Sequence, residues 1–276
     1  MTFLMPSDDI PAVANAGDKR ITLPESFGFR YGDRGPHASR TMMLSELRNL
    51  LAAVRADAPK TAYRDAIMNE NVLGKNTQAT RRESYERMGW LYGLDPTLAL
   101  FRNLRHFWEL DRDGQPLLAF LCAAARDPLL RMTIKTVLET PTGSTLSNSA
   151  MEAAVIAGAP GRFNPPTVVK IARNAASSWT QSGHLSGRRD KKRAQPVVTP
   201  AVTAYALLLG YLEGVRGALL FNTVWAQILA TSGERLIAMA GEASQRGWID
   251  FRRLGAVIDV SFPHLLTRAE LGVLSE

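Results

Sequence analysis

Apolar residues recur at intervals of three and four along most of the chain from Thr41 onward, and this period predicts amphipathic helices rather than strands. Cap residues such as Thr77 and Ser232, and the pairs Asp95–Pro96 and Asp127–Pro128, mark helix starts. The expected helices span residues 43–54, 61–71, 77–92, 95–109, 115–126, 127–139, 147–157, 166–181, 200–213, 219–230 and 232–245. The predicted fold class is mainly α.

Short stretches with strand character follow two of these helices. The first covers residues 186–198, and the second covers 248–251 and 256–262. A helix, a turn, a second helix and a hairpin form a winged helix-turn-helix, and this order occurs twice. We therefore expect an extended arm or linker at 1–40, a helical bundle at 41–140, a winged helix-turn-helix at 141–198 and a second winged-helix-like module at 199–276, each module with a small β-hairpin.

The best membrane candidate, the uncharged stretch Ala194–Leu212, does not predict a membrane span. Pro196 and Pro200 interrupt it, and the remaining run is shorter than the about 20 residues that a membrane helix needs. The start of the chain lacks the features of a secretory signal. The single cysteine, Cys122, lies in an apolar run and is expected to be a core thiol. A cytoplasmic protein without membrane contact is expected.

The surplus positive charge of the chain comes from one region. Residues 153–212 hold eight Lys and Arg residues against a single acid, Asp190, so this region accounts for the whole net charge of +7. A concentrated basic surface on a neutral body is typical of a protein that binds a polyanion, because cations that neutralise phosphates release condensed counterions. Double-stranded DNA is the expected partner, and the sequence leaves open whether RNA is also bound.

The helix expected at 166–181 has two stripes that follow the helical period. Its apolar stripe consists of Val168, Ile171, Ala172, Ala175 and Trp179. Its polar stripe consists of Lys170, Arg173, Asn174, Ser177 and Gln181. Lys and Arg bind phosphates or guanine edges and Asn can pair with adenine, so the polar stripe predicts a helix that enters the major groove. An ordinary solvated helix face is the alternative, but no acid lies between Glu152 and Asp190.

A basic run follows this helix and predicts a wing that grips the DNA backbone. Its members are Arg188, Arg189, Lys191, Lys192 and Arg193. A nuclear address or a solubilising loop is the alternative. Secondary candidates for DNA contact are Arg252 and Arg253, expected in the turn of the second hairpin, and Arg81 and Arg82. The helix with Arg81 and Arg82 also carries glutamates, which is typical of a salt-bridged surface.

The sequence predicts no catalytic residues, no cofactor and no metal site. The four histidines are isolated, with no second ligand at metal-binding spacing. The pair Gly74–Lys75 lacks the first glycine and the Ser or Thr of a phosphate loop. The acids of Glu109–Asp113 lie at a helix end, where a solvated loop is favoured over a metal site. A non-enzymatic protein is expected.

Three segments resemble the BrxA family of BREX bacteriophage-exclusion systems. They are NVLGKNTQATRRESYERMGWLYGLDP (71–96), PLLAFLCAAARDPLLRMT (116–133) and NAASSWTQSGHLSGRRDKKR (174–193). The likeness spans roughly residues 61–266, and its motifs are structural rather than catalytic. It implies a small, mostly helical, non-enzymatic DNA-binding protein that acts with other phage-defence proteins. The resemblance implies no catalytic residues in this chain, and it does not explain the first 40 residues.

These observations predict a DNA-binding accessory protein of a bacterial defence system. An assembly scaffold whose basic stretch meets an acidic partner protein is one alternative, and a transcriptional repressor is another. The oligomeric state, the DNA sequence preference and the choice of defence partners stay open.

Overall fold

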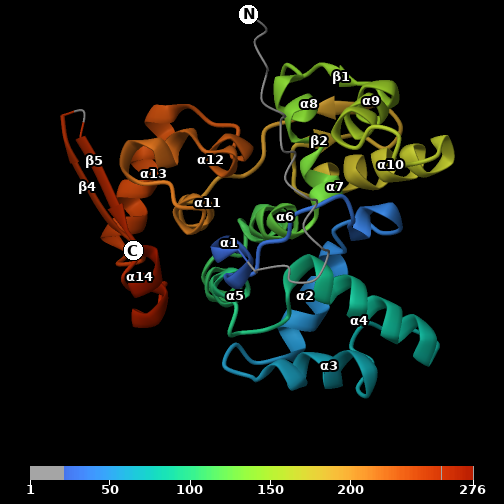
Figure 1. Cartoon of the computed structure of the whole chain (residues 1–276), viewed down its shortest axis with the longest axis horizontal. Coiled ribbons are helices and arrows are strands. Elements are labelled where there is room, and N and C mark those ends of the chain that lie inside the picture. Colours follow the sequence, from blue (N-terminus) through green and yellow to red (C-terminus); the bar gives the residue numbers. More distant parts are fainter. Residues whose placement is uncertain (1–21, 256, 276) are drawn as a thin grey trace, which may run out of the picture.

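The chain folds into packed helices with two small antiparallel sheets, as seen in the computed structural model, which describes residues 22–255 and 257–275 (Figure 1). The predicted mainly α fold with small hairpins is confirmed. The helices before residue 140 are α1 (Leu23–Ser26), α2 (Leu44–Ala53), α3 (Lys60–Met68), α4 (Gln78–Tyr92), α5 (Ala99–Leu110), α6 (Gln115–Arg126), α7 (Pro128–Arg131) and α8 (Ile134–Glu139), with a 3-10 turn η1 (Pro36–Ala38).

The second half of the chain alternates helices with short strands. Its elements are β1 (Thr145–Leu146), α9 (Asn148–Gly158), α10 (Pro165–Gln181), β2 (Leu185–Ser186), β3 (Lys191–Arg193), α11 (Pro200–Leu212), η2 (Gly217–Asn222), α12 (Val224–Ile228), α13 (Gly233–Gln245), β4 (Asp250–Leu254), β5 (Val257–Ser261) and α14 (Arg268–Ser275). The strand β1 and the helix α14 were not predicted from the sequence.

One predicted helix, at 127–139, is divided into α7 and α8. The division lies at Thr133, whose hydroxyl donates to the Leu130 carbonyl at 2.7 Å and accepts from Trp179 Nε1 at 2.8 Å. Trp179 belongs to α10, so a contact with a distant helix lies at the break between α7 and α8. The local period of apolar residues does not indicate this break. The expected helix at 219–230 is likewise replaced by η2 followed by the short α12.

The two sheets follow the hairpins that the sequence predicted, with shifted boundaries. In the first sheet β3 lies between β1 and β2, and Thr145 and Ser186 both pair with Lys192. In the second sheet β4 pairs with β5. Arg252 and Arg253 were expected in the turn, but they lie within β4, opposite Asp259 and Ile258.

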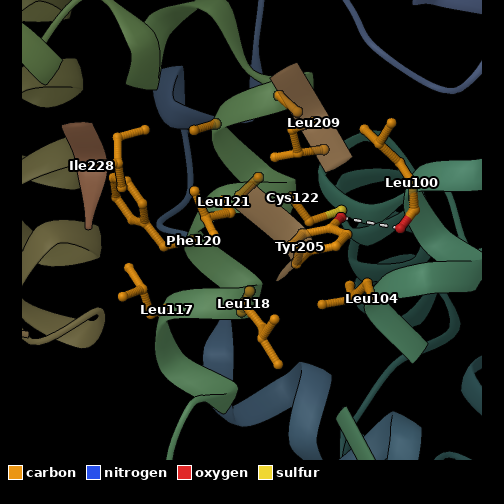
Figure 2. Close-up of a cluster of buried hydrophobic side chains, with 14 of the residues drawn as sticks. Leu100, Leu104, Leu117, Leu118, Phe120, Leu121, Cys122, Tyr205, Leu209 and Ile228 are labelled. Atoms are coloured by element: carbon orange, nitrogen blue, oxygen red, sulfur yellow. Dashed lines mark hydrogen bonds between the residues drawn. The ribbon is translucent and has the colours of Figure 1, made fainter. Parts of the chain in front are cut away.

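Two helices, α6 and α11, form the centre of the core. Leu118 and Cys122 of α6 lie beside Tyr205 and Leu209 of α11 (Figure 2). The hydroxyl of Tyr205 donates to the Leu100 carbonyl at 3.0 Å. Burial raises the pKa of the Cys122 thiol to about 11, which confirms the predicted core thiol. The buried side chains form a single cluster that includes both the helical bundle and the two later modules.

The prediction of an extended arm at residues 1–40 is wrong for residues 22–40, which pack against the rest of the protein. Residues 1–21 lie outside the described part. Phe27 and Phe29 are buried, and the backbone N–H of Arg30 donates to the Ala125 carbonyl at 3.1 Å. Arg126 is buried and donates to the carbonyls of Gly28 and Trp90, and burial lowers its pKa to about 10. The segment therefore packs into the core because two aromatic rings and a buried guanidinium hold it there.

Within the described ranges, none of the helices has both the length and the apolar character required to cross a membrane.

The buried His184 predicts a pH-dependent stability. Burial is the main cause that lowers its pKa from 6.5 to about 3, so the folded protein keeps the ring neutral. As the pH falls, the imidazole of His184 takes up a proton in the unfolded chain before it does so in the folded protein. The contribution of His184 to the stability of the folded protein is therefore complete above about pH 6.5 and declines toward pH 3. We expect the free energy of unfolding to fall by about 2 kcal/mol between pH 7 and pH 5 from this group. Urea denaturation at both pH values measures it.

The control for this prediction is His264, which is exposed. His264→Gln is expected to retain the full difference between the two pH values, while His184→Gln reduces it. Equal pH dependence in both variants would contradict the role of His184.

Candidate nucleic-acid interface

The helix α10 starts and stops at capping residues and packs one face into the core. The Oδ1 of Asn164 accepts from the Thr167 N–H at 2.9 Å, and Gly183 follows the helix at φ +87°. Every member of the predicted apolar stripe is buried, including Trp179, which contacts the ring of Phe120 at a centroid distance of 4.2 Å. This burial fixes the direction of the opposite face.

Only part of the predicted polar stripe faces solvent. Lys170 and Arg173 are exposed, and neither has an ion pair within the described residues. The Nδ2 of Asn174 donates to the His37 carbonyl at 2.9 Å, and the Oε1 of Gln181 accepts from the Leu44 N–H at 3.1 Å. Asn174 and Gln181 therefore hold the segment before α2 instead of presenting free amides to a DNA base.

Ser177 is neither fully exposed, as Lys170 and Arg173 are, nor bonded to the covering segment, as Asn174 and Gln181 are. Its side chain is half-buried, and its hydroxyl is 3.5 Å from Gln181 Nε2. The solvent-exposed polar face of α10 is thus smaller than the sequence predicted, because residues 37–44 cover the C-terminal half of this helix.

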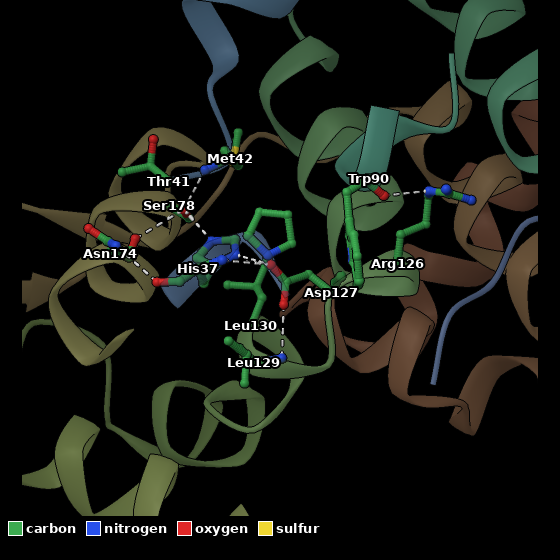
Figure 3. Close-up of polar contacts among 12 residues, drawn as sticks. His37, Thr41, Met42, Trp90, Arg126, Asp127, Leu129, Leu130, Asn174 and Ser178 are labelled. Carbon is green, nitrogen blue, oxygen red and sulfur yellow. Dashed lines mark hydrogen bonds and ion pairs between the residues drawn. The ribbon is translucent and has the colours of Figure 1, made fainter. Parts of the chain in front are cut away.

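A buried polar cluster fastens that covering segment to α10 (Figure 3). The carboxylate of Asp127 accepts from His37 Nδ1 at 2.6 Å, from the His37 N–H at 2.9 Å and from the Leu129 N–H at 2.9 Å. On the other side of the ring, His37 Nε2 is 2.8 Å from Ser178 Oγ, which also accepts from the Met42 N–H at 2.8 Å. We call His37, Asp127 and Ser178 the polar lock.

The polar lock has the Asp, His and Ser order of a hydrolase triad, but its geometry does not permit that chemistry. A nucleophilic serine must reach a substrate carbonyl and have oxyanion donors beside it. Ser178 lies inside α10, and all three side chains are buried. The cluster therefore joins three chain segments and does not form an open active site. No local pattern indicates this cluster, because His37 and Ser178 are 141 positions apart in the chain.

The hairpin formed by β2 and β3 follows α10 and contacts it. Its turn requires Gly187, since φ is +92° and a Cβ there would lie 2.3 Å from the Asp190 carbonyl oxygen. Lys191 Nζ donates to the Gly187 carbonyl at 2.9 Å and so closes the turn. Arg188, Arg189 and Lys192 are exposed. The hairpin thus presents three cations to solvent, Arg188 and Arg189 in the turn and Lys192 in β3, and uses Lys191 to hold the shape of the turn.

Arg193 has a structural position and not the solvent-facing one that the sequence predicted. It is 5% exposed, and its guanidinium donates to the carbonyls of Val137 at 3.2 Å and His184 at 3.1 Å. Burial lowers its pKa. Arg193 joins β3 to the end of α8, so it is not available to a phosphate.

Of the secondary candidates for DNA contact, one is bonded within the protein and three are exposed to solvent. Arg81 donates to the carbonyls of Lys75 and Met68, each at 3.2 Å, and so closes the loop before α4. Arg82, Arg252 and Arg253 are exposed. The strands around Arg252 and Arg253 also hold Asp250 and Asp259, so this hairpin has no net charge from its side chains.

Five cations thus remain exposed on α10 and the hairpin. They are Lys170, Arg173, Arg188, Arg189 and Lys192, and we call them the basic surface. Arg162, the other base of the region, pairs with Asp33 at 2.6 Å.

No protein-family model matches the chain, and a comparison with curated proteins finds no match.

Proposed function

We propose that this protein is a non-enzymatic, double-stranded DNA-binding protein. The observation that carries the proposal is the basic surface, in which five cations of one helix and the adjoining hairpin face solvent without ion pairs among the described residues. Unpaired cations keep their charge available to phosphates, and a DNA duplex offers phosphates at regular spacing.

The order of elements around the basic surface supports the proposal. In sequence α8, β1, α9, α10, β2 and β3 follow one another, and β1 pairs with β3. This order matches a winged helix-turn-helix, in which α10 is the recognition helix and the β2–β3 turn is the wing. In this arrangement Lys170 and Arg173 enter or border the major groove, and Arg188, Arg189 and Lys192 contact the backbone.

The free side chains favour weak sequence preference. Asn174 and Gln181, which could distinguish bases, are bonded within the protein. Exposed Lys and Arg side chains remain, and these contact phosphates as readily as bases. The resemblance to the BrxA family favours a role in a phage-defence system alongside other proteins.

A salt series with purified protein and random-sequence duplex tests this function. Five phosphate contacts predict that the logarithm of affinity falls against the logarithm of salt concentration with a slope of about −4.5. A repressor would prefer its own upstream DNA by at least ~10³-fold over random duplex. No binding to any duplex at micromolar protein and low salt would contradict the proposal and favour the scaffold alternative.

A further inference from the structure

A second positively charged site lies in the helical bundle, where α2 ends beside the end of α5 and the start of α6. A hollow of about 990 Å³ opens there. It is lined by arginines from three chain segments, Arg48 and Arg55 from α2 and the residues after it, Arg105 from α5, and Arg112 from the loop before α6. We propose that this hollow binds a small organic phosphate.

The charges around the hollow favour an anion. Four guanidinium groups line it, against the carboxylates of Glu109 and Asp113. Arg48 and Arg112 are exposed and have no ion pair within the described residues. A guanidinium presents paired N–H groups that match two oxygens of a phosphate, and a concave surface concentrates the field of several such groups. Two arginines are therefore free to bind the ligand.

Arg105 gives the hollow a fixed cation. Its side chain is buried, and Nη2 donates to the Val54 carbonyl and lies 3.0 Å from the Glu109 carboxylate. These contacts hold the guanidinium between the end of α2 and α5. A cation that is ordered before binding loses less side-chain entropy when a ligand arrives.

The start of α6 adds a further positive potential. Gln115 and Pro116, the first two residues of this 12-residue helix, line the hollow. The N-terminal end of a helix carries a partial positive charge and attracts phosphate groups. The helix dipole thus acts in the same direction as the arginines, but Asp111 already accepts from the Gly114 N–H at 3.1 Å at this helix end, and Pro116 has no N–H to offer.

Apart from Gln115, the remaining lining is apolar, which favours an organic phosphate over inorganic phosphate alone. Leu51, Val54, Trp108 and Pro116 contribute to it. A volume near 1,000 Å³ is at the upper end for small-molecule pockets, in which apolar contacts supply affinity and a few charges fix orientation. The organic part of the ligand would contact this apolar wall while the phosphate contacts Arg48 and Arg112.

Isothermal titration calorimetry of the full chain with adenosine monophosphate and with inorganic phosphate tests the proposal. We expect adenosine monophosphate to bind with one-to-one stoichiometry and at least 10-fold more tightly than inorganic phosphate. The double variant Arg48→Gln, Arg112→Gln is expected to weaken binding at least 10-fold. Both residues are exposed, so the variant should fold, and thermal denaturation verifies this. Arg34→Gln with Arg82→Gln removes the same charge elsewhere and should leave ligand binding unchanged.

Three results would overturn the proposal. The first is no heat of binding for adenosine monophosphate at millimolar concentration, and the second is equal weakening by both double variants. The third is a parallel loss of duplex DNA binding in the Arg48 and Arg112 variant, since that would make the hollow part of the nucleic-acid surface. Unchanged duplex binding in this variant is expected, so the outcome is independent of the proposed DNA-binding function.

Discussion

Asp127→Ala is expected to lower the free energy of unfolding by about 3 kcal/mol or more, because three buried N–H groups lose the carboxylate that accepts from them. The carboxylate accepts three N–H groups, two from His37 and one from Leu129, and none of these donors has access to water in the folded protein. Each buried donor that loses its acceptor costs roughly 1–3 kcal/mol. Urea denaturation at neutral pH measures the change.

The same substitution should also loosen the segment that covers α10. His37 connects residues 36–42 to Ser178, so limited proteolysis is expected to cut the Asp127→Ala variant within this segment faster than the wild type. Asp57→Ala is the matched control, because that carboxylate is exposed and pairs only with the neighbouring Arg55. A loss below about 1 kcal/mol in Asp127→Ala would contradict the role assigned to the polar lock.

Local patterns in the sequence were sufficient to predict most of the helices. The periodic apolar positions of α10 indicated which face is buried, and Thr77 and Ser232 cap α4 and α13 as expected. These features depend on residues within a few positions of one another. Helical period and capping are local properties, so the sequence expresses them directly.

The contacts that individual polar side chains make could not be predicted from local patterns in this way. Asn174 and Gln181 follow the period of an exposed stripe, yet both contact backbone groups 137 positions earlier in the chain. Arg193 belongs to a basic run, yet it bonds Val137 on α8. A period distinguishes polar from apolar faces, but it does not identify which distant segment packs on a polar face.

The segment 22–40 offered a signal that composition obscured. Its glycines, prolines and charges predicted a linker, but Phe27 and Phe29 are aromatic residues that burial stabilises. In the folded protein both rings belong to the main hydrophobic cluster. Only the three-dimensional structure shows where that core surface lies.

Replacing all five residues of the basic surface with glutamine is expected to abolish most duplex DNA binding. At 0.15 M salt, the release of about 0.9 counterion per phosphate contact predicts an affinity loss of roughly 10³-fold or more for five contacts. The side chains are exposed, so the fold should be retained. The same number of charges can be removed elsewhere in a control variant, by glutamine at Arg34, Arg64, Lys135, Arg235 and Arg268, which are all exposed.

The difference in salt dependence between these two variants is the most direct measurement of whether the basic surface binds DNA. The basic-surface variant is expected to flatten the slope of log affinity against log salt by about 4–5 units, while the control variant keeps a slope close to the wild-type value. Equal slopes for the wild type and the basic-surface variant, or equal flattening in both variants, would contradict the proposal that α10 and the β2–β3 turn contact the phosphate backbone.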